Sequence, residues 1–125
     1  MKADIQAQAN RYVENAIALL TEKAGKEDGY YKDKKYVQMA GNTLWNGVLE
    51  ALNHKFPELA NGNGRPDIKK YKEAVAKENK KMLNHLVTGY NYMHLLMGYD
   101  GDLSYQTSRT AIDEAKVLID WAAAR

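Results

Sequence analysis

The sequence predicts an all-α protein, an antiparallel up-down four-helix bundle built from one domain over residues 1–125. Glycine-containing breaks at residues 25–29, 62–64 and 98–101 divide the chain into four segments. In each segment apolar residues recur at steps of three and four, the period of an amphipathic helix. Connections of about five to ten residues favour antiparallel neighbours. No window alternates apolar and polar residues as a strand would.

The first predicted helix covers residues 3–24 and ends before Gly25, which we expect at its C′ position because glycine tolerates positive φ. The second covers residues 34–56, with Asp33 as its N-cap. Its apolar surface is broad, which is typical of a helix contacted from two sides.

Two glycines, Gly41 and Gly47, lie inside the second predicted helix. Each costs about 1 kcal/mol relative to alanine in a helix interior. We therefore expect another helix to pack closely against both positions.

The third predicted helix begins after Asp67, its expected N-cap, and continues to residue 97. At 1.5 Å per residue it would span about 46 Å, against about 33 Å for the first helix. We therefore expect this long helix to overhang the bundle or to bend at Gly89. Asn79 lies within its apolar stripe, where an amide needs partners, and either fixes the register of the bundle or lines a small polar pocket. Gly98 is the expected cap.

The fourth predicted helix starts near Ser104 and runs to the C-terminus. Ser104 is interpreted as its N-cap. Ser108 is interpreted as a small buried residue rather than a nucleophile, since no Ser/His/Asp constellation is evident.

Composition excludes several kinds of chemistry. The chain has no cysteine, which removes disulfides, thiolate zinc sites and cysteine nucleophiles. No apolar run approaches the roughly 18 residues of a membrane span, and the N-terminus lacks the apolar region of a signal peptide. We therefore expect a cytoplasmic protein without membrane contact.

Charge gives only weak support for nucleic-acid binding. The chain has 18 basic and 16 acidic residues, a net charge of +2. Six lysines lie in the first half of the third predicted helix, where a solvated helix face is the ordinary interpretation and nucleic-acid binding the alternative. These are Lys69, Lys70, Lys72, Lys77, Lys80 and Lys81.

No metal or cofactor site is predicted. The Glu-x-x-His pairs of di-iron bundles are absent, and His85 and His94 would point about 180° apart on one helix. The glycine-rich residues 61–66 precede a helix without following a strand, so a turn is expected there instead of a phosphate loop.

The helix layout resembles a known family. The first segment contains ANRYVENAIALL and the second YVQMAGNTLWNGVLEAL, and a long third helix precedes the alanine-rich TAIDEAKVLIDWAAA. This pattern resembles the HEPN-like superfamily, small helical bundles found with nucleotidyltransferases and toxin–antitoxin systems. Catalytic members carry an arginine, four to six residues, and then a histidine, which together cleave RNA.

That catalytic motif is absent from this sequence. None of the arginines precedes a histidine at the required distance, and the nearest approach is Lys80 five residues before His85. Lysine lacks the planar fork of arginine. The resemblance therefore implies an inactive module for binding or dimerisation.

Two functional hypotheses remain open. The leading one is a non-catalytic interaction or dimerisation module, because apolar side chains remain outside the helix stripes; the same side chains would alternatively cover bundle ends within one chain. They are Trp45, Leu49, Leu95, Leu96, Val117 and Trp121. The alternative is an RNA-processing or nucleotide-related enzyme, or a toxin–antitoxin component, that uses His85, Tyr92 and Lys80.

Overall fold

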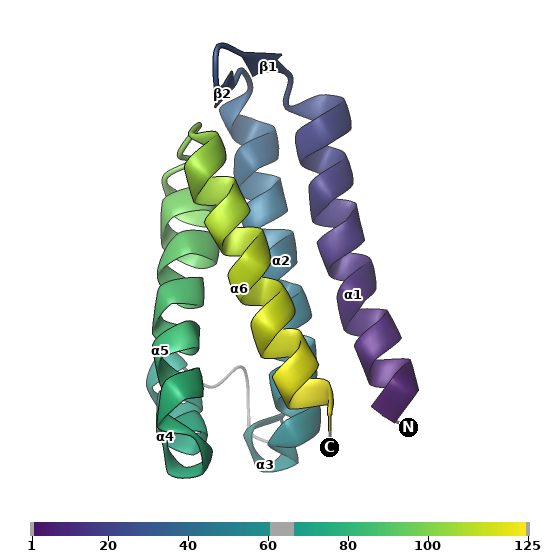
Figure 1. Cartoon of the computed structure of the whole chain (residues 1–125), viewed down its shortest axis with the longest axis vertical. Coiled ribbons are helices and arrows are strands. Elements are labelled where there is room, and N and C mark those ends of the chain that lie inside the picture. The colour runs from purple at the N-terminus through teal and green to yellow at the C-terminus, as the bar shows by residue number, and fades with distance from the viewer. Residues whose placement is uncertain (1, 61–66, 125) are drawn as a thin grey trace.

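The computed structural model describes residues 2–60 and 67–124, and over these residues the chain is almost entirely helical (Figure 1). The all-α prediction is confirmed. The α-helices in the described ranges are α1 (Lys2–Ala18), α2 (Lys34–Lys55), α3 (Pro57–Ala60), α4 (Ile68–Glu78), α5 (Lys80–Gly89) and α6 (Tyr105–Ala123). The predicted turn at residues 61–66 lies outside the described residues.

Two π-helical segments extend α-helices without a break. The first, η1 (Leu19–Lys23), continues α1, and the second, η2 (Tyr90–Tyr99), continues α5. Their i→i+5 pattern is visible where the Ala24 N–H donates to the Leu19 carbonyl over 3.0 Å. Together α1 and η1 match the first predicted helix. Gly25 follows with φ of +72°, as expected for a C′ glycine.

A short hairpin follows, which the sequence analysis did not predict. Strand β1 (Lys26–Glu27) pairs antiparallel with β2 (Tyr30–Tyr31). Asp28 and Gly29 form the turn, with φ of +53° and +84°. Positive φ at both central residues is the type I′ geometry that Asp-Gly favours, so the dipeptide was a signal for this hairpin.

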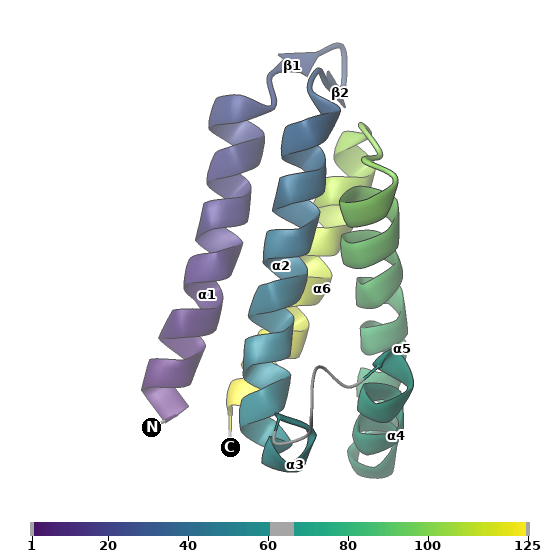
Figure 2. The same cartoon turned by 180° about the vertical axis from the view of Figure 1, so that it is seen from behind.

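Helix α2 lies at the centre of the fold, packed against α1, α6 and η2 (Figure 2). Its N-cap is Asp33, whose carboxylate accepts from the Lys35 N–H over 3.0 Å, as predicted. Both glycines stand at close contacts. A Cβ on Gly41 would lie 2.5 Å from the Met97 Cβ, and one on Gly47 would lie 2.8 Å from the Tyr12 Cβ. The expectation of close helix packing is confirmed.

The third predicted helix is not continuous, which corrects the expectation of a bend at Gly89. The break lies at Asn79, whose backbone is extended (φ −162°, ψ 106°), while Gly89 is helical with φ of −60°. Asn79 closes α4 and caps α5, since its side chain accepts from the Met82 N–H over 3.1 Å. It is half-buried and does not act as an amide inside a continuous apolar stripe.

The break folds α4 back along the next segment. Tyr71 of α4 donates to the Asn53 Oδ1 near the end of α2 over 2.7 Å, and Glu78 lies 3.3 Å from the Lys55 Nζ. Helix α4 therefore descends beside α2, while α5 and η2 rise beside α6 (Figures 1 and 2). Without this reversal the predicted helix would overhang the other helices.

The end of η2 also differs from the prediction. Gly98 is within the helix, and Gly101 adopts positive φ at +67°. The Asp102 N–H donates to the Leu96 carbonyl over 2.8 Å. This hydrogen bond spans one residue more than the equivalent bond of a Schellman motif at the end of an α-helix. Ser104 then caps α6 by accepting from the Gln106 N–H, as predicted.

Candidate functional site

One hollow is lined by three helical segments that are far apart in sequence. It has a volume of about 230 Å³ and lies where α2, the first turn of α4 and η2 meet. Most of its lining is aromatic or aliphatic, with one carboxylate. We call it the aromatic pocket, and its residues are Trp45, Leu49, Asp67, Ile68, Tyr71, Tyr90 and His94.

Three of the rings in the aromatic pocket contact one another. The centroids of Trp45 and Tyr90 are 5.3 Å apart with planes at 71°, an edge-to-face contact. Tyr90 and His94 are 5.2 Å apart with planes at 30°. The Trp45 plane lies at 71° to the Tyr90 plane but at only 41° to the His94 plane, whose centroid is 6.4 Å from that of Trp45. Such pairs add about 0.5–1.5 kcal/mol beyond area burial.

His94 is the polar side chain of this pocket that folding leaves incompletely satisfied. Its Nδ1 is buried and has no hydrogen-bond partner within the described part of the chain. A buried polar atom without a partner costs about 1–3 kcal/mol. The buried His94 nitrogen therefore carries a free-energy cost that packing alone does not explain.

The predicted interface residues lie in several places. Trp45 and Leu49 are only 5% and 4% exposed, because they belong to the hydrophobic core, and they also line the aromatic pocket. Trp121 is half-buried near the end of α6, with its ring 6.3 Å from Phe56. Leu96 and Val117 are half-buried, and Leu95 is 38% exposed.

The candidate catalytic residues lie on α5 and η2, which follow one another without a break. His85 pairs with α6, since its Nδ1 lies 2.7 Å from the Glu114 Oε1. Lys80 is exposed at the start of α5, and Tyr92 is half-buried against the core. Sequence reasoning missed Glu114 because the contact depends on how α5 and α6 pack.

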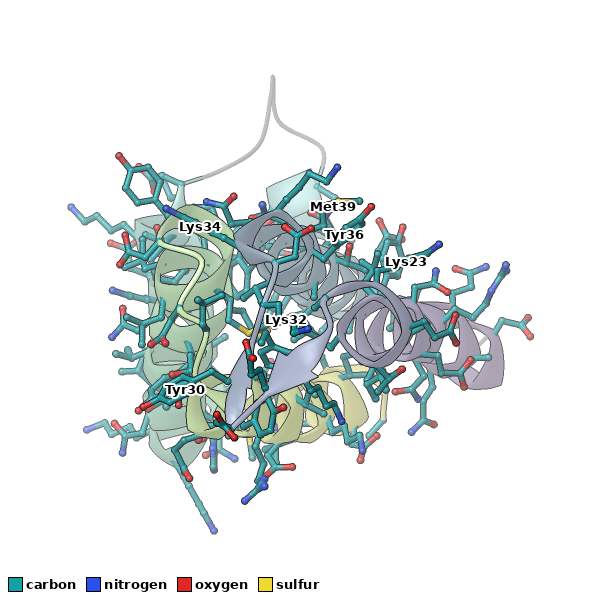
Figure 3. All side chains as sticks on the ribbon, turned by 90° about the horizontal axis from the view of Figure 1, so that it is seen from above. Lys23, Tyr30, Lys32, Lys34, Tyr36 and Met39 are labelled. Carbon is teal, nitrogen blue, oxygen red and sulfur yellow. The ribbon has the colours of Figure 1, made fainter. Side chains whose placement is uncertain are left out.

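Large apolar side chains are exposed near one end of the molecule. Tyr99 is 77% exposed at the end of η2, Tyr30 is 57% exposed on the hairpin, Met39 is 44% exposed near the start of α2, and Leu95 lies one turn before Tyr99. We call these four residues the hairpin-end surface. Figure 3 views this end directly and shows Tyr36 beside Met39.

Beneath the hairpin, a pair of hydroxyl groups ties β2 to α6. The Tyr31 hydroxyl lies 2.8 Å from the Ser108 Oγ, which itself donates to the Tyr105 carbonyl over 3.0 Å. Ser108 is 3% exposed, as expected for a small buried residue. Partial burial, followed by the proximity of Tyr31 and Asp28, raises the pKa of Tyr105 above its ordinary value.

The described residues contain no group of three or more histidine, aspartate or glutamate side chains arranged to hold a metal ion. No helix within residues 2–60 and 67–124 has the length and apolar character needed to cross a membrane.

Two comparisons link this chain to other proteins. Residues 4–124 match the family described as "Domain of unknown function (DUF5618)". A solved structure of a protein of unknown function from Dyadobacter fermentans shares 39% sequence identity, with a TM-score of 0.90. That match covers 100% of this chain and 98% of the other. No curated protein matches this chain significantly.

Proposed function

This chain belongs to the DUF5618 family of domains of unknown function, and we propose that it is a non-catalytic helical interaction module that self-associates. The observation that carries this proposal is the hairpin-end surface. Single exposed apolar residues are normal on protein surfaces. Here Tyr30, Met39, Leu95 and Tyr99 all lie near one end, with Tyr30 and Met39 on different sides of it (Figure 3), and tyrosine and methionine are enriched at interfaces.

The charges at this end favour a second copy as the partner. Exposed lysines such as Lys23 and Lys32 lie among exposed acids such as Glu22 and Glu27. A two-fold contact brings the same patch of both copies together, so a patch with both signs can complement itself. A standard interface of about 800 Å² per partner would take about a ninth of the 7112 Å² accessible surface.

We also propose that the domain is HEPN-like and based on an up-down four-helix bundle. In this description α1–η1, α2, α5–η2 and α6 are the four helices, and α4 is an additional helix folded back at Asn79. Because the sequence has no arginine placed four to six residues before a histidine, we expect no ribonuclease activity from that motif.

Sedimentation velocity over a range of concentrations tests self-association. We expect a reversible dimer that is weakened by Met39→Glu or Tyr99→Glu, because a charge in an apolar contact must be desolvated. Asn84→Glu on the exposed side of α5 is the matched control and should leave the dimer intact. A protein that stays monomeric at high concentration would refute the proposal, as would equal weakening by the control.

The contact between His85 and Glu114 favours the alternative hypothesis, that the protein is an enzyme. A carboxylate holding an imidazole, as Glu114 holds His85, is an arrangement used in general acid–base catalysis. In that case Tyr92 and Lys80 would assist on a nucleotide or RNA substrate. Incubation with RNA and nucleotides should then show turnover that His85→Gln abolishes. Turnover that survives this change, or no turnover at all, would exclude the alternative.

A further inference from the structure

We propose that the aromatic pocket binds the alkylated ammonium group of a small organic cation. This inference does not depend on self-association, because the pocket lies between α2, α4 and η2 and shares no residue with the hairpin-end surface. Each proposal can therefore fail without the other.

The charge of the lining favours a cation. Asp67 supplies a carboxylate, and no lysine or arginine is among the described residues that line the pocket. Asp67 also caps α4, since its Oδ1 accepts from the Lys70 N–H over 3.3 Å. The negative charge thus offsets the positive end of the α4 dipole, which would otherwise repel a cation here.

The aromatic rings of the pocket also favour a cation. Cations are attracted to the faces of tryptophan and tyrosine within about 6 Å of the ring centroid. Trp45 and Tyr90 meet at 71°, and the His94 plane lies at 41° to Trp45 and 30° to Tyr90, so three rings of different orientation line the hollow. A cation in the hollow would lie near more than one ring, while Leu49 and Ile68 would contact its alkyl groups.

The size of the hollow limits the ligand. Its volume of about 230 Å³ is below the roughly 300–1,000 Å³ of pockets that enclose drug-sized ligands. The pocket therefore fits a head group such as trimethylammonium. A free choline-like molecule and a trimethylated lysine side chain in a peptide present this same chemistry.

Charge recognition is tested by titrating the full chain with choline and with 3,3-dimethylbutan-1-ol, its neutral carbon isostere. Trp121→Phe leaves Trp45 as the single tryptophan, so its fluorescence reports on the pocket. We expect choline to bind about tenfold or more tightly than the isostere, the ratio expected from one desolvated cation–π contact. Equal binding of the two, or binding of neither, would overturn the proposal.

Variants locate the site. Asp67→Asn keeps an N-cap but removes the charge, and we expect affinity for choline to fall about tenfold while the melting temperature stays close to that of the parent. Tyr90→Leu removes a ring and should weaken binding similarly, whereas Tyr36→Leu at the hairpin end should not. Binding that survives both pocket changes would refute the assignment. If a peptide with trimethyl-lysine binds more tightly than choline, the ammonium group that the pocket recognises belongs to a protein side chain. If choline binds more tightly, it belongs to a free metabolite.

Discussion

The close contact between α2 and η2 makes Gly41 the position where one added methyl group should be most costly. A Cβ there would lie 2.5 Å from the Met97 Cβ, 2.6 Å from the Met93 carbonyl oxygen and 2.7 Å from the Gly98 nitrogen. Two of these three atoms belong to the backbone of η2, so no side-chain rotation relieves the overlap.

The size of the effect follows from opposing contributions. Gly41→Ala gains about 1 kcal/mol from helix propensity. Normal carbon contacts are about 3.5–4.0 Å, so α2 and η2 would have to separate by about 1 Å, and a gap of that size removes a quarter to a half of the dispersion energy of the atoms that face it. Overpacking of this kind costs about 1–3 kcal/mol or more. Subtracting the propensity gain from this cost leaves an expected net loss of up to about 2 kcal/mol.

Gly89→Ala is the matched control. A Cβ at this position would meet the Met93 Cε at 2.8 Å and the Leu118 Cδ1 at 3.1 Å, both ends of flexible side chains. Its stability should stay within about 1 kcal/mol of the parent, because the propensity gain offsets a small rearrangement. Urea unfolding followed by circular dichroism measures both variants. If Gly41→Ala proved as stable as Gly89→Ala, the reasoning from backbone contact would be wrong.

Four further variants test individual side chains. Asn79→Ala should cost about 1 kcal/mol through loss of the α5 cap, and an unchanged urea midpoint would argue against that role. Lys55→Met should stay within about 1 kcal/mol of the parent because Glu78, its ion-pair partner, is half-exposed, whereas Lys55→Ala should cost about 2 kcal/mol or more in packing beside Trp121. The Tyr105 hydroxyl has a higher pKa in the folded chain than in the unfolded chain. Its contribution to the free energy of unfolding is therefore complete below about pH 10 and is lost as pH rises through the folded-state pKa. Tyr105→Phe should therefore flatten the alkaline loss of stability, and an unchanged pH profile would contradict the shift.

Local signals in the sequence predicted much of the fold. Asp33, Asp67 and Ser104 each cap the helix that they were expected to cap, and Gly25 adopts the expected positive φ. These features depend on a few neighbouring residues, so they can be read without knowledge of tertiary contacts. The Asp-Gly turn is equally local, but its flanking strands of two residues each are too short to show an alternating apolar pattern.

The break at Asn79 was harder to predict, because the apolar stripe continues on both sides of it. Asparagine is a preferred N-cap, and that preference was the available signal. The aromatic pocket depends on this break. Asp67 and His94 would be about 40 Å apart on one continuous helix, yet they line the same hollow.

The π-helical form of η2 was not predicted. Side chains in η2 advance by a smaller angle than in an α-helix. The placement of Leu95 outside the buried stripe nevertheless holds along Tyr90–Tyr99, since Met93 and Met97 are buried and Leu95 is 38% exposed.

Because α4 folds back at a single residue, we expect this helix to unfold locally before the rest of the domain. Helix α4 is tied to α5 by the turn and to α2 by contacts such as those of Tyr71 and Glu78, whereas α1, α2 and α6 pack directly on one another. Elements with fewer buried contacts unfold locally at lower free energy than the whole domain. The amide protons of α4 should therefore exchange with solvent before those of α2. Since α4 carries one wall of the aromatic pocket, any ligand held there would slow that exchange.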